Sequence, residues 1–485
     1  MQLISRGLVA GAISMLFVAF PANAQDSSIF TQCPETTDLH PDGDGIKCDH
    51  LVAGDGMATM ADGVPQYIFS YARVPLPGEL TDPDDPSSER APTEVSGEYP
   101  GWVMAKGLMA ANIPAPTIVV DEDDELFLSL TNVGMAQRPD LFDPHTIHWH
   151  GFPQAGSIFD GVPDSSISIN MGATLTYYYS AKDAGTYMYH CHVEATEHMQ
   201  MGMLGNLWVR PRQNRLAVGD SLYDSFVGGG DFADVDVNPD DEVWPNPDPA
   251  VLDVDVNGNG IFDGPNAANV DVGGTTAPPL PWDPADGPEP VHTAGATYAY
   301  NDGDGTTRYD VDFPIQIGSF DPEFHDNSFN TQPLPFAGMK DTYFMLNGRG
   351  YPDTVNTAEL STVNDFSGEQ FSQPVHSLIT ATAGQRILLR ISNLAITEFY
   401  TLGTNGLDML VVGRDARLLR DDAGNNMYYE TNSLTLGGGQ SVDVIITPTN
   451  AGTYFLYAKN LDRLSNNNQN FGGMMTEIRV ATATP

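Results

Sequence analysis

The chain is poor in positive charge. Its 485 residues include 21 lysines and arginines against 64 aspartates and glutamates, which gives a formal net charge of −43 at pH 7. A surface of this sign repels phosphate backbones and anionic membranes, so we expect no nucleic acid partner. Two explanations of the acidity stay open: solubility in a saline environment, and attraction of metal cations as ligands or substrates.

Long apolar runs are confined to the first residues. Arg6, the apolar run over 8–20 and the small residues at 22–24 are typical of a secretory signal, so we expect cleavage after residues 1–24. No later stretch reaches the roughly 20 apolar residues of a membrane-spanning helix. The sequence therefore predicts a soluble periplasmic or extracellular protein that makes no membrane contact.

Cysteine is scarce, with three residues in the whole chain. Cys33 and Cys48 flank an acidic loop, and in an oxidising compartment we expect them to form a disulfide. A metal site that adds His40 and His50 is the alternative, although these spacings match no strong zinc template. Cys191 is left unpaired, and an odd cysteine in a secreted protein requires a chemical explanation.

Two regions break into short segments rich in Val, Ile, Thr, Tyr and Phe, separated by Pro, Gly, Asn and Asp. Segments of this kind without helical periodicity favour β-sandwiches. We predict an all-β chain with two Greek-key sandwiches at 67–212 and 308–485. An acidic extension at 25–66 precedes the first sandwich, and an acidic connector rich in Pro, Gly and Asp at 213–307 joins the two.

Oxygen-bearing side chains recur through a glycine-containing loop of the connector, at Asp255, Asn257, Asn259 and Asp263. This pattern is similar to calcium loops, but the bidentate carboxylate that usually closes such a loop is missing. A shorter version is Asp-Gly-Asp-Gly at 302–305. Calcium binding and an acidic, turn-rich linker that binds no ion both stay open.

Residue types that bind transition metals concentrate in two stretches, 145–151 and 189–203. Together they hold six of the eleven histidines and Cys191. Side chains alternate between the two faces of a strand. If both stretches are strands, they present two separate ligand sets on opposite faces.

The first set combines two imidazoles, a thiolate and a thioether, from His145, Cys191, His198 and Met203. This is the ligand group of a blue-copper electron-transfer site, in which the axial methionine tunes the reduction potential.

The second set is four imidazoles, from His148, His150, His190 and His192. Four imidazoles suit copper that binds a small oxygen or nitrogen substrate. Cys191 lies between His190 and His192 in the chain, so an electron at the first set has a through-bond route to the second.

These motifs resemble those of the multicopper oxidases, the family of laccases and ceruloplasmin, which read His-x-x-His-x-His and His-Cys-His followed by His and Met. Other segments are similar to the family's first domain (116–118, 160–163, 184–187) and to a later one (346–353, 437–444, 472–475). The resemblance implies cupredoxin-like domains that oxidise a phenol or a metal ion and reduce dioxygen to water.

The resemblance also implies a role for each ligand. Type 1 copper would be bound by His145, Cys191, His198 and Met203, type 2 copper by His148, and the type 3 copper pair by His150, His190 and His192. The stretch from Cys191 to His198 is two residues longer than the usual family spacing, so Met199 and Met201 are alternatives to Met203 as the axial ligand.

The second sandwich departs from the family further. Phe399 to Asn405 stands where a partner domain would offer a histidine pair, and no His-Cys-His follows near the chain's end. The family's cluster takes eight histidines, of which this chain supplies four. We therefore expect a homo-oligomer in which two first domains meet across a two-fold axis.

Two alternatives stay open. A nitrite-reductase-like trimer would use His150, His190 and a neighbour's histidine, but Lys459 occupies the corresponding position. A blue-copper electron carrier or copper-binding protein without catalysis would explain the missing half of the cluster, and would show no oxygen uptake.

Overall fold

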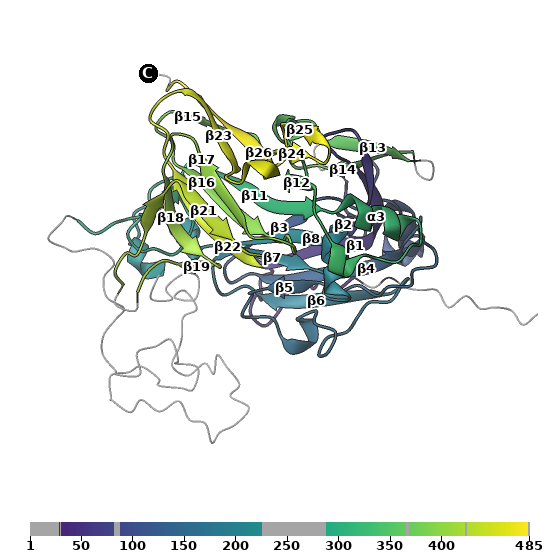
Figure 1. Ribbon diagram of the computed structural model, residues 1–485. Coiled ribbons are helices and arrows are strands. Elements are labelled where there is room, and N and C mark those ends of the chain that lie inside the picture. The colour runs from purple at the N-terminus through teal and green to yellow at the C-terminus, as the bar shows by residue number, and fades with distance from the viewer. Residues whose placement is uncertain are drawn as a thin grey trace, which may run out of the picture.

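The computed structural model describes residues 29, 31–81, 88–225, 288–364, 368–421 and 424–483. The expected signal segment at 1–24 and the expected calcium loop at 255–263 lie outside these described residues. Within the described ranges, no helix is long and apolar enough to cross a membrane. Two β-sandwiches make up most of the described chain (Figure 1).

The first sandwich consists of two four-stranded sheets, in the orders β2-β1-β4-β6 and β3-β8-β7-β5. Its strands are β1 (Ile46–Thr59), β2 (Pro65–Arg73), β3 (Ala115–Asp121), β4 (Glu125–Gly134), β5 (His148–His150), β6 (Thr174–Ser180), β7 (Gly185–His190) and β8 (Leu204–Arg210). Helix α1 (Tyr99–Gly107) lies between β2 and β3 in the chain, and the short α2 (Ala195–Gln200) between β7 and β8.

The second sandwich has a large sheet in the order β19-β18-β22-β16-β11-β12-β24-β25, in which β20 also pairs with β18, and a smaller sheet in the order β15-β26-β23-β17-β21. The large sheet contains β11 (Val311–Phe320), β12 (Tyr343–Leu346), β16 (Ile387–Asn393), β18 (Met409–Arg414), β19 (Arg417–Leu418), β20 (Tyr429–Thr431), β22 (Gln440–Ile446), β24 (Ser465–Asn466) and β25 (Gln469–Asn470). The smaller sheet contains β15 (Ile379–Thr382), β17 (Tyr400–Thr404), β21 (Ser433–Leu436), β23 (Gly452–Ala458) and β26 (Met475–Ala481).

The remaining elements lie outside these sheets. They are the hairpin of β9 (Thr297–Tyr298) with β10 (Arg308–Tyr309), the hairpin of β13 (Leu360–Asn364) with β14 (Gly368–Gln373), and helix α3 (Pro322–Phe329) after β11.

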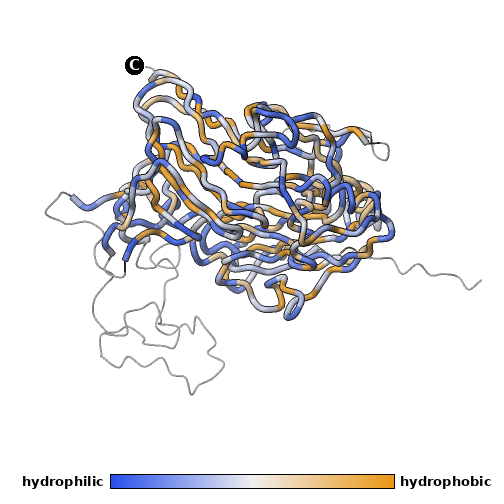
Figure 2. Tube along the Cα trace, in the orientation of Figure 1, coloured by the Kyte–Doolittle hydropathy of each residue, from blue (hydrophilic) through white to orange (hydrophobic). Residues whose placement is uncertain are grey.

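Apolar residues of alternating strand positions form one core inside each sandwich, as the orange inner segments of Figure 2 show. In the first core the Trp149 ring stacks on Tyr179 at 3.8 Å between centroids. Trp149 is 1% exposed, and complete burial of a large apolar side chain contributes roughly 1.5–3 kcal/mol. This packing fixes β5, because Trp149 stands between His148 and His150 and anchors the strand from its inner face.

The two sandwiches also share a buried polar contact. Asp443 on β22 accepts hydrogen bonds from Thr186 Oγ1 on β7 (2.6 Å) and from Tyr300 Oη (2.5 Å). Arg390 on β16 lies beside this group, is 1% exposed, and donates to Thr186 Oγ1 at 3.2 Å. The second sandwich is thus attached to β7, the strand that ends at His190.

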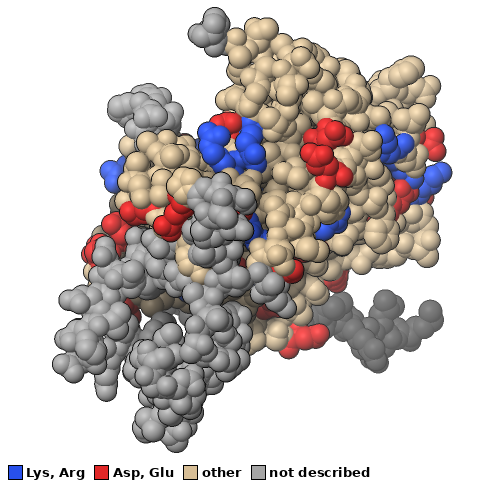
Figure 3. All heavy atoms as spheres, turned by 90° about the vertical axis from the view of Figure 1, so that its left-hand side faces the viewer, with Lys and Arg blue, Asp and Glu red and all other residues tan. Residues whose placement is uncertain are grey.

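The predicted all-β fold with two sandwiches is confirmed. The first sandwich begins at Ile46, before the expected boundary at residue 67, because β1 pairs with both β2 and β4. Gly and Ala interrupt the hydrophobic alternation of β1, which hides it from a pattern search. On the face seen in Figure 3, acidic and basic side chains are interspersed and form no single acidic field.

Candidate metal centres

Three donor atoms of the predicted first set meet in the core of the first sandwich. His198 Nδ1 lies 3.2 Å and His145 Nδ1 3.9 Å from Cys191 Sγ. All three side chains have no exposed surface. His145 precedes β5, Cys191 directly follows β7, and His198 is on α2, so three separate elements deliver the ligands.

Electrostatics favour a thiolate at this site. Burial opposes ionisation of Cys191, but the neighbouring His198 and His145 outweigh it and lower the pKa of the thiol well below its ordinary value. Burial also opposes protonation of His198. The Cys191 thiolate and the Asp143 carboxylate outweigh that effect and raise the pKa of His198 to about 10.

The donor set fits copper. Two imidazole nitrogens and a thiolate sulfur face one another in a space closed to water, and a soft thiolate with imidazoles is a ligand set that selects copper. The far nitrogens of both rings, His145 Nε2 and His198 Nε2, are buried without a hydrogen-bond partner. Asp143 Oδ2 lies 3.9 Å from His198 Nε2.

The structure separates the three methionines that the sequence offered as axial ligand. Met199 packs with Met188, Leu204 and Leu394 in a cluster separate from the core that holds Cys191. Met201 and Met203 belong to the same buried core as Cys191. The backbone ties Met203 directly to two of the ligand residues: Met203 N donates to His198 O (2.9 Å), and Cys191 N donates to Met203 O (3.3 Å).

The second predicted set lies at the edge of the same sheet. Donor atoms of His148, His150 and His190 all lie within 4.8 Å of one another. His192 completes the face, with its ring centroid 5.0 Å from that of His148. β5 and β7 pair in a register that places His148 opposite His190.

Hydrogen bonds to carbonyl groups orient two of these rings. His148 Nδ1 donates to Asp160 O at 2.6 Å, and His190 Nδ1 donates to Cys191 O at 2.8 Å. In the neutral form each ring thus carries its proton on Nδ1, and Nε2 is the nitrogen available to a metal. Burial lowers the pKa of His190 to about 3, so this imidazole is neutral at physiological pH.

The expectation that both stretches are strands is only partly met. β5 covers 148–150 alone, and β7 ends at His190. His145 and Cys191 lie outside the strands, and a helix carries His198. The two ligand sets are nevertheless separate, because the chain turns inward at Cys191 directly after β7.

The four-histidine face borders a pocket of about 450 Å³ that the second sandwich also lines, with residues 394–399, Gly438 and Gly439. Gly439 lies close to one of the rings: a Cβ built on it would lie 2.6 Å from His150 Nε2. Among the described residues that line the pocket, the histidines come from the first sandwich alone. The sequence predicts an outward face that needs a cover, and the chain's own second sandwich provides part of it.

The other cysteines and histidines near the N-terminus form no metal group. Cys33 and Cys48 are joined in a disulfide. His50 is buried, with Nδ1 2.7 Å from Tyr99 Oη and Nε2 2.8 Å from Thr131 Oγ1. His40 Nε2 donates to a backbone carbonyl at 3.1 Å.

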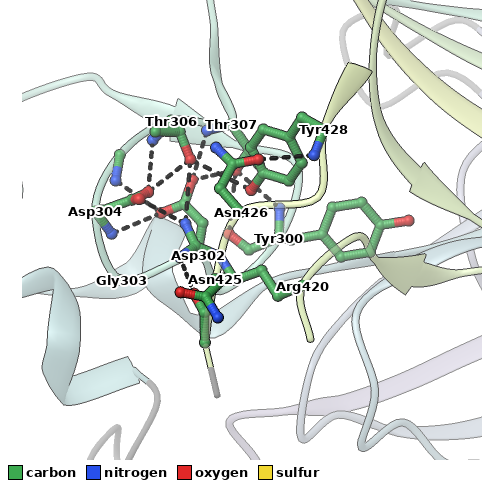
Figure 4. A network of polar contacts seen from close by, with 12 residues as sticks. Tyr300, Asp302, Gly303, Asp304, Thr306, Thr307, Arg420, Asn425, Asn426 and Tyr428 are labelled. Carbon is green, nitrogen blue, oxygen red and sulfur yellow. Dashed lines mark hydrogen bonds and ion pairs between the residues drawn. The ribbon is translucent and has the colours of Figure 1, made fainter. Parts of the chain in front are cut away.

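The loop at 302–305 resembles a short calcium loop in sequence, but other groups of the protein bind its carboxylates (Figure 4). Asp302 is fully buried and accepts hydrogen bonds from the Gly305 and Thr307 amides and from Gln213 Nε2. Asp304 pairs with Arg420 at 2.5 Å. Both carboxylates are used within the fold: Asp302 ties the loop to Gln213 after the first sandwich, and Asp304 ties it to the second sandwich.

The sequence did not predict that two residues, Asp160 and Gly439, contact the histidines of the site. Asp160, whose carbonyl orients His148, and Gly439, which faces His150, both lie in segments similar to the family (160–163 and 437–444). The resemblance marked these segments, but the contacts that they make depend on the fold.

Comparison with known proteins places the chain in a family. The family model described as multicopper oxidase matches residues 101–214, and a second model with the same description matches 332–478. Together these matches cover more than half of the chain. The chain belongs to the multicopper oxidase family. The matches include most of both sandwiches of this multicopper oxidase, among them the two histidine-rich stretches 145–151 and 189–203.

Relatives with known names align mainly with part of this multicopper oxidase. Multicopper oxidase MCE of Talaromyces pinophilus is 36% identical over 103 residues, which are 21% of this chain and 16% of the relative. Laccase-1 of Emericella nidulans is 33% identical over 127 residues, 25% of this chain and 16% of the relative. The aligned region thus spans about a sixth of these relatives.

Among solved structures, the blue copper oxidase from Nitrosomonas europaea is similar in fold, with a TM-score of 0.51 and 18% identity. The similarity covers 90% of this chain and 86% of that one. At this identity the likeness shows the cupredoxin-like fold of the two sandwiches.

Proposed function

We propose that this multicopper oxidase is a copper-dependent oxidoreductase of the periplasm or the extracellular space. It takes single electrons from a phenol or a reduced metal ion at the site of His145, Cys191, His198 and Met203. It delivers them to the four-histidine face, where dioxygen is reduced to water. The observation that carries the proposal is the position of Cys191, which links the two ligand groups through the chain.

The residues present fit copper at both groups. The type 1 ligands are His145, Cys191 and His198 with Met203 as the axial candidate. His148 would hold the type 2 copper, and His150, His190 and His192 the type 3 pair. Copper in these places supplies one-electron redox chemistry at the first group and multi-electron reduction of dioxygen at the second.

The chain between the two groups is short and rigid. Cys191 is bonded covalently to His190 and His192, and its carbonyl oxygen also accepts the Nδ1 proton of His190 at 2.8 Å. An electron can therefore pass through covalent bonds and through one hydrogen bond. Complete burial of the Cys191 side chain keeps water and oxidants away from the thiolate.

The four histidines are half of the family's cluster, and we propose that a second copy of the chain supplies the other half. Support comes from His148, His150 and His192, which are only half-buried although the second sandwich lines their pocket. The symmetric arrangement needs no histidine from the second sandwich. Native mass spectrometry of the copper-loaded protein tests it, and a stable monomer that holds one copper would contradict it.

A second candidate function is electron transfer without catalysis. The observation that favours it is the lining of the pocket, where residues 394–399, Gly438 and Gly439 of the second sandwich offer no histidine. A carrier would use only the buried first group, and its four-histidine face would bind no dioxygen-reducing cluster.

Oxygen uptake separates the two functions. Copper-loaded protein is mixed with a substituted phenol or with Fe(II), and dissolved oxygen is followed with an electrode. We expect uptake by the wild type and none by C191A, which lacks the thiolate. Reduction of the blue site without oxygen uptake in the wild type would favour the carrier instead.

A further inference from the structure

Helix α3 of the second sandwich reaches into the first sandwich beside the type 1 ligands. It follows β11 and lies against β2 (Figure 1). Phe324 on this helix has no exposed surface and belongs to the hydrophobic core of the first sandwich. His325, the next residue, is also fully buried. The second sandwich therefore contributes side chains to the interior that holds Cys191.

The His325 ring lies between two segments of the first sandwich. Its Nδ1 is 2.5 Å from Tyr67 O on β2, and its Nε2 is 3.0 Å from Gln200 O at the end of α2. Burial lowers the pKa of His325 to about 4, so at neutral pH the ring carries one N–H and donates it to one carbonyl at a time. In either tautomer the ring fills the space between β2 and α2.

A second group of the same sandwich holds the Gln200 side chain. Gln200 Nε2 donates to Asp341 Oδ1 at 3.1 Å, and Gln200 is 1% exposed. Asp341 itself is fixed by the hydroxyl groups of Ser319 and Thr397, which both donate to its other carboxylate oxygen. Gln200 is thus held at its backbone and at its side chain by two residues from outside the first sandwich.

Gln200 stands between the type 1 ligand His198 and the axial candidate Met203. The next two carbonyls of this turn are held from within the first sandwich: Phe69 N donates to Met201 O at 3.0 Å, and Ser70 Oγ donates to Gly202 O at 2.9 Å. Of these three consecutive carbonyls, that of Gln200 is held from outside the first sandwich and the other two from within it, so the contacts of Gln200 help to set the path of the chain between His198 and Met203. The position of an axial thioether tunes a blue copper, and outer partners orient its ligands.

We propose that His325 and Asp341 are positioning residues for the type 1 copper, which act through Gln200 on the turn that carries Met203. The proposal rests on the type 1 site of the proposed function. By this proposal the second sandwich supports the type 1 site, although none of the type 1 ligands belongs to the second sandwich.

Three variants test this role: H325L, D341A and Q200M. Each is loaded with copper, and three properties are measured: copper affinity, the reduction potential, and the hyperfine splitting of the thiolate-bound copper in electron paramagnetic resonance. Loss of an outer partner typically weakens metal binding by about 10- to 100-fold, and we expect a loss in this range with a shifted potential. D326A, on the exposed side of α3, is the matched control and should behave as the wild type.

The combination of D341A with Q200M tests the route, because Asp341 should have no further effect once Gln200 lacks its amide. Wild-type potential and hyperfine splitting in H325L and D341A, with reduced thermal stability alone, would overturn the proposal. If D341A does not fold, Q200M replaces it, because Q200M removes the amide that Asp341 holds and leaves both buried groups in place. If H325L does not fold, H325Q replaces it at the contact with the Gln200 carbonyl. Wild-type spectra at both contacts overturn the proposal. Absence of thiolate-to-copper absorption in the loaded wild type is a different result, which refutes the type 1 site itself.

Discussion

Replacement of Gly439 by alanine should disturb the four-histidine face and leave the type 1 site intact. Gly439 has φ = +84°, and a Cβ there would lie 2.6 Å from His150 Nε2. Gly406 is a matched control, since its φ is +77° and a Cβ would meet no atom within 4 Å. An L-residue in this left-handed region costs about 1–2 kcal/mol, so G439A and G406A should both lose about that much stability.

The two variants should differ in metal binding. In G439A the His150 ring must move, and the donor group that it forms with His148 and His190 then loses its spacing of 4.8 Å or less. We expect the copper affinity of this group to fall by about tenfold or more, whereas G406A should retain it. The type 1 absorption should be the same in both.

Urea unfolding of the metal-free variants gives the stability loss, and copper analysis with electron paramagnetic resonance gives the occupancy of each site. The reasoning is refuted if G439A and G406A bind the same amount of copper outside the type 1 site. It is also refuted if G439A changes the type 1 signal and leaves copper binding by the four-histidine face unchanged. Gly439 faces His150 and is not among the residues around the Cys191 thiolate.

Three further predictions follow from the same contacts. C191A should remove the blue absorption and the type 1 resonance while copper still binds the four-histidine face, which metal analysis would show. D443A removes the acceptor of the buried Thr186 and Tyr300 hydroxyls, while Arg390 keeps Asp312 at 3.5 Å. Urea unfolding should therefore show a loss of about 1–3 kcal/mol, against less than about 0.5 kcal/mol for the exposed control D408A. A loss below about 1 kcal/mol for D443A would contradict this. Burial lowers the pKa of His50 to about 3. The neutral ring therefore contributes its full stability above the unfolded-state pKa of about 6.5, and this contribution is lost as the pH falls from there toward 3, by about 2 kcal/mol at pH 5. If H50Q shows the same pH dependence as the wild type in thermal unfolding of the metal-free protein, His50 is not the cause.

Much of the fold follows from local sequence pattern. Short β-branched and aromatic segments between turn residues predicted two sandwiches, and most strands lie within the expected regions. β1 was missed as part of the first sandwich, since Gly54 and Gly56 interrupt its apolar pattern and pack closely against β4 and the segment before β3.

The grouping of the donor side chains was also predictable, because metal-binding residue types crowd into two stretches; their roles as copper ligands stay predictions. The prediction that both stretches are strands was too simple: the turn into α2 places His198 beside Cys191. The contacts of Gly439 with His150 and of His325 with Gln200 join residues more than 100 positions apart. No local sequence pattern predicts such pairs. The position of Gly439 over the four-histidine face and that of His325 beside Gln200 can therefore be seen only in the folded structure.

The central claim is that one chain carries a complete type 1 group and a second copper group linked to it through Cys191. Copper stoichiometry combined with electron paramagnetic resonance on the copper-loaded mature protein tests it most directly. The account predicts one type 1 signal per chain together with additional copper that the triple variant H148A/H150A/H190A loses. A single copper per chain, with the type 1 signal alone and no loss in that variant, would contradict it.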